Sequence, residues 1–332
     1  MHSTTDWNET SLPALGMGCW AIGGPFFAGD DPVGWGASDD DTSRATIHAA
    51  YDAGLRLFDT AQAYGTGHSE SLLGEVLADK PEARIVTKVG IGIDPATRQI
   101  TGLVTDPAAI RAAFEESRKR LRRDVIDLAL VHPNEFSVAE AAPVFDVLGD
   151  LHARGQIRAF GWSTDFPDKA RAYADRAGFG AVEYAANVFF AGEQISAAVA
   201  HIKATALIRS PLAMGLLGGR ITPDTEVPKD DVRARENDNM DWFTGRRMTP
   251  HYARRLDAIR SCLTVGGRTL AQGAIGWLWA RHAGAIPVPG MRTPQQVADL
   301  CGALSLGPLP ANTMAEIERL IERPPEGPPR PR

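Results

Sequence analysis

Four side chains with complementary chemistry occur at or after the ends of short apolar runs in this 332-residue chain: Asp59, Tyr64, Lys88 and His132. Asp59 and Tyr64 follow the run that begins at Leu57, whereas Lys88 and His132 each end a run of their own. If these runs are parallel strands of one barrel, the four side chains converge at its mouth, where such barrels carry out their chemistry. The pattern therefore predicts an enzyme.

A carboxylate, a phenol, an ammonium and an imidazole suit the reduction of a carbonyl group by hydride transfer. Negative charge builds on the carbonyl oxygen, so a proton donor must lie beside it. A free phenol, with a pKa of about 10, is a weak acid at neutral pH, and a neighbouring ammonium lowers that pKa. We expect Tyr64 to donate the proton, Lys88 to activate it and Asp59 to hold Lys88. His132 would orient the carbonyl oxygen or relay the proton.

Each of these residues also has an ordinary structural explanation when it is considered alone. An aspartate–lysine pair often only stabilises a fold, a tyrosine often packs in a core, and a histidine before a proline is often satisfied within a turn. Their joint placement at the ends of three successive predicted strands favours the functional interpretation. Histidine and cysteine residues with metal-ligand spacing are absent from the sequence, so we expect no metal site.

Strand and helix patterns alternate along the chain and would position these residues. Short β-rich runs predict strands at 17–21, 56–60, 84–89, 125–131, 157–162, 181–187, 205–209 and 285–288. Apolar residues at three- and four-residue intervals predict helices at 42–53, 69–77, 107–121, 138–154, 168–177, 194–204, 252–282 (more than one helix) and 293–304. Eight such units predict an α/β fold of the (β/α)8 TIM-barrel type.

Two long segments interrupt the alternation and would emerge on the catalytic face of the barrel. Residues 23–41 are rich in glycine and aspartate and contain Trp35, and residues 220–250 form a charged insertion that contains Trp242. Loops of this length commonly shape a substrate pocket. We therefore expect the barrel to carry long loops at its C-terminal face.

Length and composition limit the class of protein. We expect a single domain over residues 1–322 and a proline-rich tail over residues 323–332 that is extended or disordered. The net charge of -6 argues against binding to nucleic acid or to an anionic membrane, which need a basic face. The N-terminus lacks the pattern of a signal peptide, so a cytoplasmic protein with a small-molecule partner is expected. The sequence does not set the oligomeric state.

Seven segments of the chain, in order, resemble the aldo-keto reductase superfamily. They are 58–65 (FDTAQAYG), 67–70 (GHSE), 86–89 (VTKV), 127–132 (DLALVH), 161–163 (GWS), 210–217 (SPLAMGLL) and 288–294 (VPGMRTP). The chain looks more like the bacterial and potassium-channel-β-like branch than the mammalian aldose reductases. The resemblance implies a catalytic tetrad of Asp59, Tyr64, Lys88 and His132 in an NADPH-dependent carbonyl reductase.

The resemblance also implies residues that bind cofactor and substrate. The cofactor set is Gly18, Cys19, Trp20 and Asp59 at the mouth; Ser163, Thr164, Glu183 and Arg209 at the nicotinamide; Ser210, Pro211, Leu212, Gly215, Leu217 and Arg220 at the pyrophosphate; and Gly290, Arg292, Thr293 and Gln296 at the adenosine phosphate. The substrate set is Trp20, Trp35, Tyr64, His132 and Trp242. Thr164, Glu183 and Arg209 replace the asparagine, glutamine and stacking aromatic residue that are usual in the family. A planar guanidinium can itself stack on a ring.

Two other functions agree with the same residues. The tetrad would equally serve a dehydrogenase that oxidises a sugar or an alcohol. The channel-β resemblance also allows a scaffold or redox sensor that binds a nicotinamide cofactor and turns over little. An intact tetrad favours catalysis over the scaffold, and the substrate and the reaction direction stay open.

Overall fold

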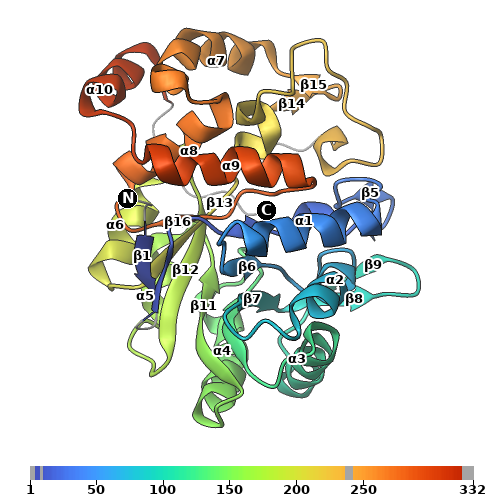
Figure 1. The fold of residues 1–332 in the computed structure, drawn as a ribbon. Coiled ribbons are helices and arrows are strands. Elements are labelled where there is room, and N and C mark those ends of the chain that lie inside the picture. The colour runs from blue at the N-terminus through green and yellow to red at the C-terminus, as the bar shows by residue number, and fades with distance from the viewer. Residues whose placement is uncertain (1–3, 8–9, 236–241, 324–332) are drawn as a thin grey trace.

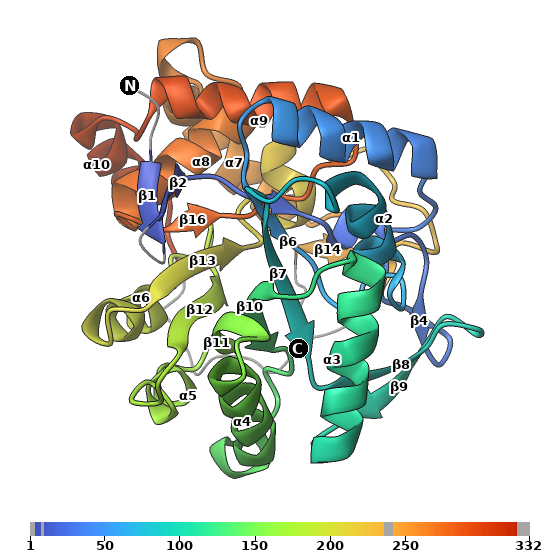
Figure 2. The ribbon, with the colours of Figure 1, turned by 60° about the horizontal axis from the view of Figure 1, so that its bottom comes forward.

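The computed structural model describes residues 4–7, 10–235 and 242–323, and within these residues eight parallel strands form one sheet (Figures 1 and 2). In order around the sheet they are β3 (Met17–Gly18), β6 (Leu57–Asp59), β7 (Arg84–Val89), β10 (Ile126–Val131), β11 (Ile157–Ser163), β12 (Phe179–Ala185), β13 (Thr205–Arg209) and β16 (Ile286–Pro287). The edge strands are joined too, because Gly16 N and Gly18 N donate to Pro287 O and Pro289 O, both at 2.9 Å. The sheet closes, and the predicted TIM barrel is confirmed.

Helices surround the barrel, as Figure 2 shows. They are α1 (Asp40–Asp52), α2 (His68–Leu77), α3 (Pro107–Leu121), α4 (Val138–Ala153), α5 (Pro167–Ala172), α6 (Glu193–His201), α7 (Pro250–Leu263), α8 (Leu270–Arg281), α9 (Pro294–Leu306) and α10 (Ala311–Leu320). Short 3-10 turns are η1 (Trp20–Ile22), η2 (Ala213–Gly218), η3 (Val232–Ala234) and η4 (Val265–Gly267). Across the described part of the chain, these helices lack the combination of length and apolar character that a membrane span requires.

The structure refines several of the predicted helix boundaries. The predicted helix at 252–282 is two helices, because Gly266 and Gly267 adopt positive φ between α7 and α8. Thr293 caps α9, since its side chain accepts from Gln296 N. The helix α10 was not predicted.

Short strand pairs fill segments that were predicted as loops or left unassigned. They are β1 (Thr4–Trp7) with β2 (Thr10–Pro13), β4 (Phe27–Ala28) with β5 (Asp31–Pro32), β8 (Ile91–Asp94) with β9 (Gln99–Leu103), and β14 (Phe243–Thr244) with β15 (Arg247–Met248). The strands β4 and β14 lie in the two long segments of the mouth, so these segments have structure of their own.

Apolar side chains fill the barrel interior and separate its two ends. Leu12 of β2 packs among inward-facing residues of the barrel wall and is 3% exposed. Those residues are Leu57, Val86, Leu128, Leu130, Ala159, Ala181, Leu207, Ile286 and Val288. Burial of each large aliphatic side chain contributes about 1.5–3 kcal/mol. Because this core fills the barrel, polar side chains can gather at the C-terminal ends of the strands.

Two helical glycines give a matched test of how tightly the outer layer packs. A Cβ atom at Gly74 of α2 would lie 2.0 Å from Arg120 O of α3, whereas one at Gly149 of α4 would meet nothing within 4 Å. Gly74→Ala should lower the free energy of unfolding by about 1–3 kcal/mol through overpacking. Gly149→Ala should raise it by up to about 1 kcal/mol because alanine favours the helix. Urea denaturation measures both, and equal effects would contradict the close contact between α2 and α3.

Candidate functional site

The parallel register of the barrel brings the predicted residues to one end. Asp59 is the last residue of β6, and it pairs in register with Val86 of β7. Lys88 follows two residues later on β7, and His132 directly follows β10, with its backbone N donating to Val89 O at 2.8 Å. Asp59, Lys88 and His132 therefore lie at the C-terminal ends of three adjacent strands, as the sequence predicts.

Lys88 is the centre of the polar cluster at this end. Its Nζ donates to Asp59 Oδ1 at 2.5 Å, to Thr60 O at 3.1 Å and to Tyr64 OH at 3.2 Å. A second carboxylate oxygen, Glu183 Oε2, lies 3.2 Å from the same Nζ. The structure thus joins Asp59, Tyr64 and Lys88, and it adds a contact from Glu183 that the sequence analysis did not predict.

Burial and charge together determine the protonation of this cluster. Burial, followed by the charge of Glu183, raises the pKa of Asp59 well above its ordinary value. Burial by itself would lower the pKa of Lys88, but the carboxylates of Asp59 and Glu183 raise it above the ordinary value. Lys88 is therefore an ammonium ion at neutral pH.

The protonation of Tyr64 differs from the sequence-based expectation. Burial raises the pKa of the Tyr64 phenol, and this effect exceeds the opposing attraction of the Lys88 ammonium. The charge of Lys88 lowers this pKa, but the loss of solvent around the phenol raises it by more. Tyr64 thus keeps its proton at rest, and Lys88 can act by stabilising the phenolate once it forms.

His132 completes the group as a neutral side chain. Burial, with the positive charges of Lys88 and Arg209, lowers the pKa of His132 well below its ordinary value. Its ring meets the Tyr64 ring edge-on, with centroids 5.7 Å apart. A neutral imidazole can donate one hydrogen bond, so His132 and Tyr64 together offer two donors at the mouth.

Aromatic side chains form one wall beside these donors. The Trp20 ring stacks on the Tyr64 ring at 5.8 Å, and Trp35 meets Trp20 edge-on at 5.5 Å. Trp20 Nε1 donates to Val33 O at 3.1 Å, which fixes the indole against the loop that carries Trp35. The predicted substrate residues Trp20, Trp35, Tyr64 and His132 are therefore contiguous.

A tight backbone contact holds the loop that carries Tyr64. Gly65 has φ +62, and a Cβ atom there would lie 1.8 Å from Gly23 O, so glycine is required. Ser69 Oγ donates to Cys19 O at 2.9 Å and lies 2.8 Å from Thr60 Oγ1. These contacts join the loop to the ends of β3 and β6.

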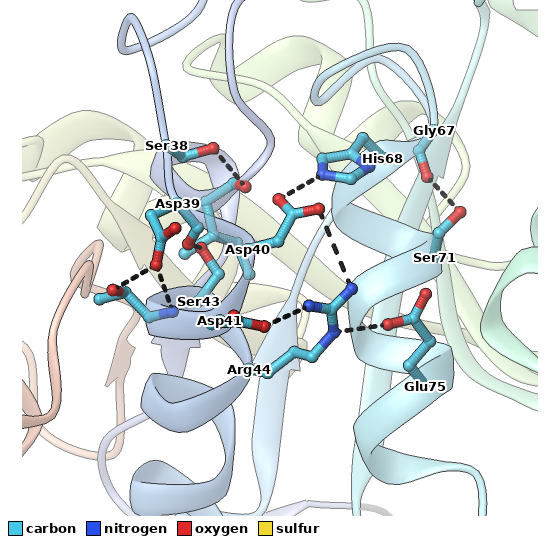
Figure 3. Close-up of polar contacts among 12 residues, drawn as sticks. Ser38, Asp39, Asp40, Asp41, Ser43, Arg44, Gly67, His68, Ser71 and Glu75 are labelled. Atoms are coloured by element: carbon cyan, nitrogen blue, oxygen red, sulfur yellow. Dashed lines mark hydrogen bonds and ion pairs between the residues drawn. The ribbon is translucent and has the colours of Figure 1, made fainter.

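A partly exposed polar network ties the first turns of α1 to α2, which follows this loop (Figure 3). His68 Nε2 lies 2.9 Å from Asp40 Oδ1. Arg44 donates to Asp41 Oδ1 at 3.0 Å and to Glu75 Oε2 at 2.7 Å. Figure 3 shows Arg44 reaching from α1 to α2, so the network helps to position the segment that follows Tyr64.

A cleft of about 690 Å³ opens beside this network, outside the predicted site. Its walls are Gly23, Gly24, Pro25, Ala37, Ser38, Asp39, Asp40, Gly65, Thr66, Gly67, His68, Ser71, Pro95, Arg98 and Arg120. Acidic and basic side chains both line it, and Asp40 and His68 contact each other. The cleft therefore presents no single charge to a ligand.

Two of the predicted nicotinamide residues, Thr164 and Arg209, belong to a second polar cluster. Arg209, at the end of β13, makes an ion pair with Asp165, and Thr164 Oγ1 donates to Asn134 Oδ1 at 2.9 Å. The Asp165 backbone N also donates to Asn134 Oδ1, at 3.0 Å. Asp165 and Asn134 were not among the predicted site residues. An arginine at the end of a predicted barrel strand is a signal in the sequence that could point to an acidic partner, because a buried guanidinium needs one.

The predicted pyrophosphate loop has an unusual backbone. Ser210, Ala213, Met214 and Gly215 all have positive φ. Such a conformation turns the chain sharply directly after β13. In this loop Pro211 and Leu217 are buried, Leu212 is half-buried, and the nearby Arg220 is exposed.

The predicted adenosine-phosphate residues lie at the start of α9. Arg292 N donates to Gln296 Oε1 at 2.7 Å, and Thr293 Oγ1 accepts from Gln296 N at 3.3 Å. The Arg292 guanidinium donates to Trp35 O at 3.2 Å and to Ala37 O at 2.5 Å. Arg292 therefore also holds the Trp35 loop, a contact that the sequence analysis did not predict.

The second long segment reaches the Trp35 loop as well, whereas Trp242 packs elsewhere. Val232 N donates to Gly34 O at 2.7 Å, and the Arg233 guanidinium lies 4.7 Å from the centre of the Trp35 ring. Trp242 instead meets the Tyr252 ring of α7 edge-on at 6.5 Å. Trp35 therefore lies against Trp20, which stacks on Tyr64, whereas Trp242 lies against α7.

Buried polar atoms at the mouth fit a nicotinamide group. Within the described residues, three buried nitrogen atoms lack hydrogen-bond partners: Arg209 Nε, Arg209 Nη1 and His132 Nδ1. Glu183 Oε2 makes an ion pair with Lys88 but no hydrogen bond. An unsatisfied buried polar group costs about 1–3 kcal/mol. A carboxamide supplies N–H donors and a carbonyl acceptor, which match a carboxylate and a guanidinium. The residues present are therefore compatible with a nicotinamide cofactor.

Comparisons with known proteins identify the family and the fold. A model of the Aldo/keto reductase family matches residues 14–322. The aldo-keto reductase YhdN of Bacillus subtilis (strain 168) is 28% identical over 302 residues, covering 88% of this chain and 86% of the relative.

Solved structures extend the likeness to the whole fold. A glycerol dehydrogenase from Gluconobacter oxydans has 30% identity and a TM-score of 0.80, with 97% of each chain covered. An aldo-keto reductase from Klebsiella pneumoniae in complex with NADPH shares the fold, with 21% identity, a TM-score of 0.69, and coverage of 98% of this chain and 97% of that one. Because the family model spans nearly the whole sequence, this chain belongs to the aldo/keto reductase family, whose members are oxidoreductases that use nicotinamide cofactors.

Proposed function

We propose that this protein reduces an aldehyde or ketone to an alcohol with NADPH, and that Tyr64 is the general acid. The observation that carries the proposal is the Lys88 ammonium, which lies 3.2 Å from Tyr64 OH while Asp59 holds it at 2.5 Å. A bound reduced nicotinamide would supply the hydride. The chain itself supplies the proton and the hydrogen bonds around the carbonyl oxygen.

The protonation states support donation from Tyr64 to a substrate oxygen. The raised pKa of Tyr64 keeps the phenol protonated until negative charge develops beside it. The Lys88 ammonium then stabilises the phenolate that remains. His132, neutral because its pKa is lowered, can donate a hydrogen bond that orients the carbonyl oxygen.

Residues along the mouth would bind the cofactor. Gly18, Cys19, Trp20, Ser163, Thr164, Glu183 and Arg209 would surround the nicotinamide; Ser210, Pro211, Leu212, Gly215, Leu217 and Arg220 the pyrophosphate; and Gly290, Arg292, Thr293 and Gln296 the adenosine phosphate. Thr164 would act through Asn134, because its hydroxyl already donates to that side chain. The wall formed by Trp20 and Trp35 would contact the substrate, and Trp242 is proposed as a more distant part of the same pocket.

A second candidate function is the oxidation of a sugar or another polyol. The specific observation that favours it is the 30% identity to a glycerol dehydrogenase over 97% of each chain. Absorbance at the reduced-cofactor band distinguishes the two, because carbonyl substrates with NADPH and polyols with NADP⁺ change it in opposite directions. Tight NADPH binding without turnover of any carbonyl substrate or polyol would favour a scaffold.

Removal of the Tyr64 hydroxyl tests the proposed general acid. Tyr64→Phe keeps the ring that stacks on Trp20, so folding and NADPH affinity should hardly change. The chemical step should slow by roughly 100- to 10,000-fold because the proton donor is lost. Single-turnover kinetics with a carbonyl substrate measure the effect, with Tyr51→Phe on α1 as the control. Reduction by Tyr64→Phe at the parent rate would refute the assignment.

The other members of the tetrad should show a related hierarchy. Lys88→Met should be severely impaired, whereas His132→Ala should lose less if the imidazole mainly orients the substrate. Tyr64→Phe combined with Lys88→Met should cost much less than the product of the single losses, because both disable one proton-donating unit. If the loss of rate in the double variant equals the product of the two single losses, Lys88 does not act through Tyr64.

Arg292 should determine the preference for NADPH over NADH. A guanidinium suits the 2′-phosphate of NADPH through charge-assisted hydrogen bonds, and two bonds to backbone oxygens leave further donors available. NADPH should bind more tightly than NADH, and Arg292→Ala should abolish most of the difference. Arg220→Ala is the control, since loss of a cation at the pyrophosphate should weaken both cofactors alike. Titration calorimetry measures the six affinities of the three proteins for the two cofactors, and equal affinities of the parent for NADPH and NADH would be decisive against the idea.

Arg209 should influence the balance between oxidised and reduced cofactor. Its positive charge at the nicotinamide would disfavour the oxidised ring, although the ion pair with Asp165 moderates this effect. Arg209→Tyr should therefore raise the affinity for oxidised relative to reduced cofactor. Arg209→Tyr combined with Asp165→Asn controls for the carboxylate that the single variant leaves unpaired. An unchanged affinity ratio in both variants would mean that Arg209 does not face the nicotinamide.

A further inference from the structure

Lys88 lies between two buried carboxyl groups from different parts of the barrel. Asp59 Oδ1 and Glu183 Oε2 are 2.5 Å and 3.2 Å from its Nζ. The side chains of Lys88, Asp59 and Glu183 are 0%, 6% and 2% exposed. Solvent therefore does little to screen their charges.

One ammonium cannot balance two buried carboxylates. With both carboxyl groups ionised, the three side chains would carry a net charge of -1 in a site from which water is excluded, which is costly. Burial, followed by the charge of Glu183, raises the pKa of Asp59. One proton on either carboxyl group would cancel the excess charge and leave the other carboxylate to pair with Lys88.

The groups around the pair do not neutralise the extra charge. Arg209 makes its ion pair with Asp165. Ser163 Oγ donates to Glu183 Oε1 at 3.0 Å but carries no charge. The neutral His132, the protonated Tyr64 and the Cys19 thiol, whose pKa is raised by burial, complete the surroundings.

We propose that Asp59 and Glu183 share one proton and hold Lys88 jointly, so that Glu183 is a second positioning residue for the Lys88 ammonium. When either carboxyl group is removed, the other becomes ionised and pairs with Lys88 one to one. Glu183 thus makes Asp59 partly dispensable. The kinetic consequences of this pairing rest on the proposed function, whereas its consequences for stability do not.

The kinetic test compares two single variants with the double variant. Asp59→Asn and Glu183→Gln should each slow the chemical step by no more than about tenfold, whereas the double variant should lose about 100-fold or more, as expected when a general acid is disabled. The optimum of the pH profile should shift in the single variants, which a merely structural role would not cause. An Asp59→Asn variant as slow as the double variant would overturn the proposal.

The second test measures stability without cofactor or substrate. A carboxyl group whose pKa is raised in the folded protein stabilises the fold below its unfolded pKa of about 4, and this contribution is lost as the pH rises through the folded pKa. The parent should lose this contribution as Asp59 ionises. The Glu183→Gln variant should not lose it, because its Asp59 is already ionised and paired with Lys88. The free energy of unfolding of Glu183→Gln relative to the parent should therefore increase from about pH 4 to pH 8.

Urea denaturation across this pH range supplies the measurement, and circular dichroism verifies that each variant is folded. Ser163→Ala is the matched control, because it removes a hydrogen bond from Glu183 but keeps both carboxyl groups, and its stability difference should stay constant with pH. If the free energies of unfolding of the parent and Glu183→Gln change with pH in parallel, the proposal of a shared proton is overturned. If no carbonyl is reduced by the parent, the proposed function fails, and the stability curves still decide on the carboxyl pair.

Discussion

The charge of one buried lysine is the constraint on which the rest of the site depends. Transfer of an isolated ammonium ion from water to a protein interior costs several kcal/mol of free energy, so Lys88 needs anionic and dipolar partners. Asp59 and Thr60 O come from the end of the neighbouring strand β6. Glu183 comes from β12, which is separated from β7 by β10 and β11 in the sheet order.

Closure of the barrel makes the contact between Lys88 and Glu183 possible. Strands in a flat sheet lie about 4.8 Å apart, so β7 and β12 would be separated by roughly 14 Å. In the closed barrel, Glu183 Oε2 reaches within 3.2 Å of Lys88 Nζ across the interior. The fold and the charge cluster therefore depend on each other, since the ring of strands creates the contact that holds its buried cation.

Sequence patterns predict the barrel well because parallel strands and their helices carry strong local signals. Strand ends also predict Asp59, Lys88 and His132, since their position on the mouth follows from strand direction alone. The contacts of Glu183 with Lys88, of Arg209 with Asp165 and of Arg292 with the Trp35 loop join distant segments, and local spacing does not encode them. The helix α10 escaped prediction because few of its residues are buried, chiefly Thr313 and Ile317.

On the proposed roles, the resting charges of the site favour reduction over oxidation at neutral pH. Tyr64 and His132 face the mouth as neutral donors, and the positive charge lies behind Tyr64 on Lys88. This arrangement stabilises negative charge that develops on a substrate oxygen. Oxidation of an alcohol would instead need Tyr64 as a phenolate, and burial opposes that form because it raises the pKa of the phenol. A polyol dehydrogenase built on this site would therefore gain activity as the pH rises, whereas a carbonyl reductase would have its proton donor ready at neutral pH.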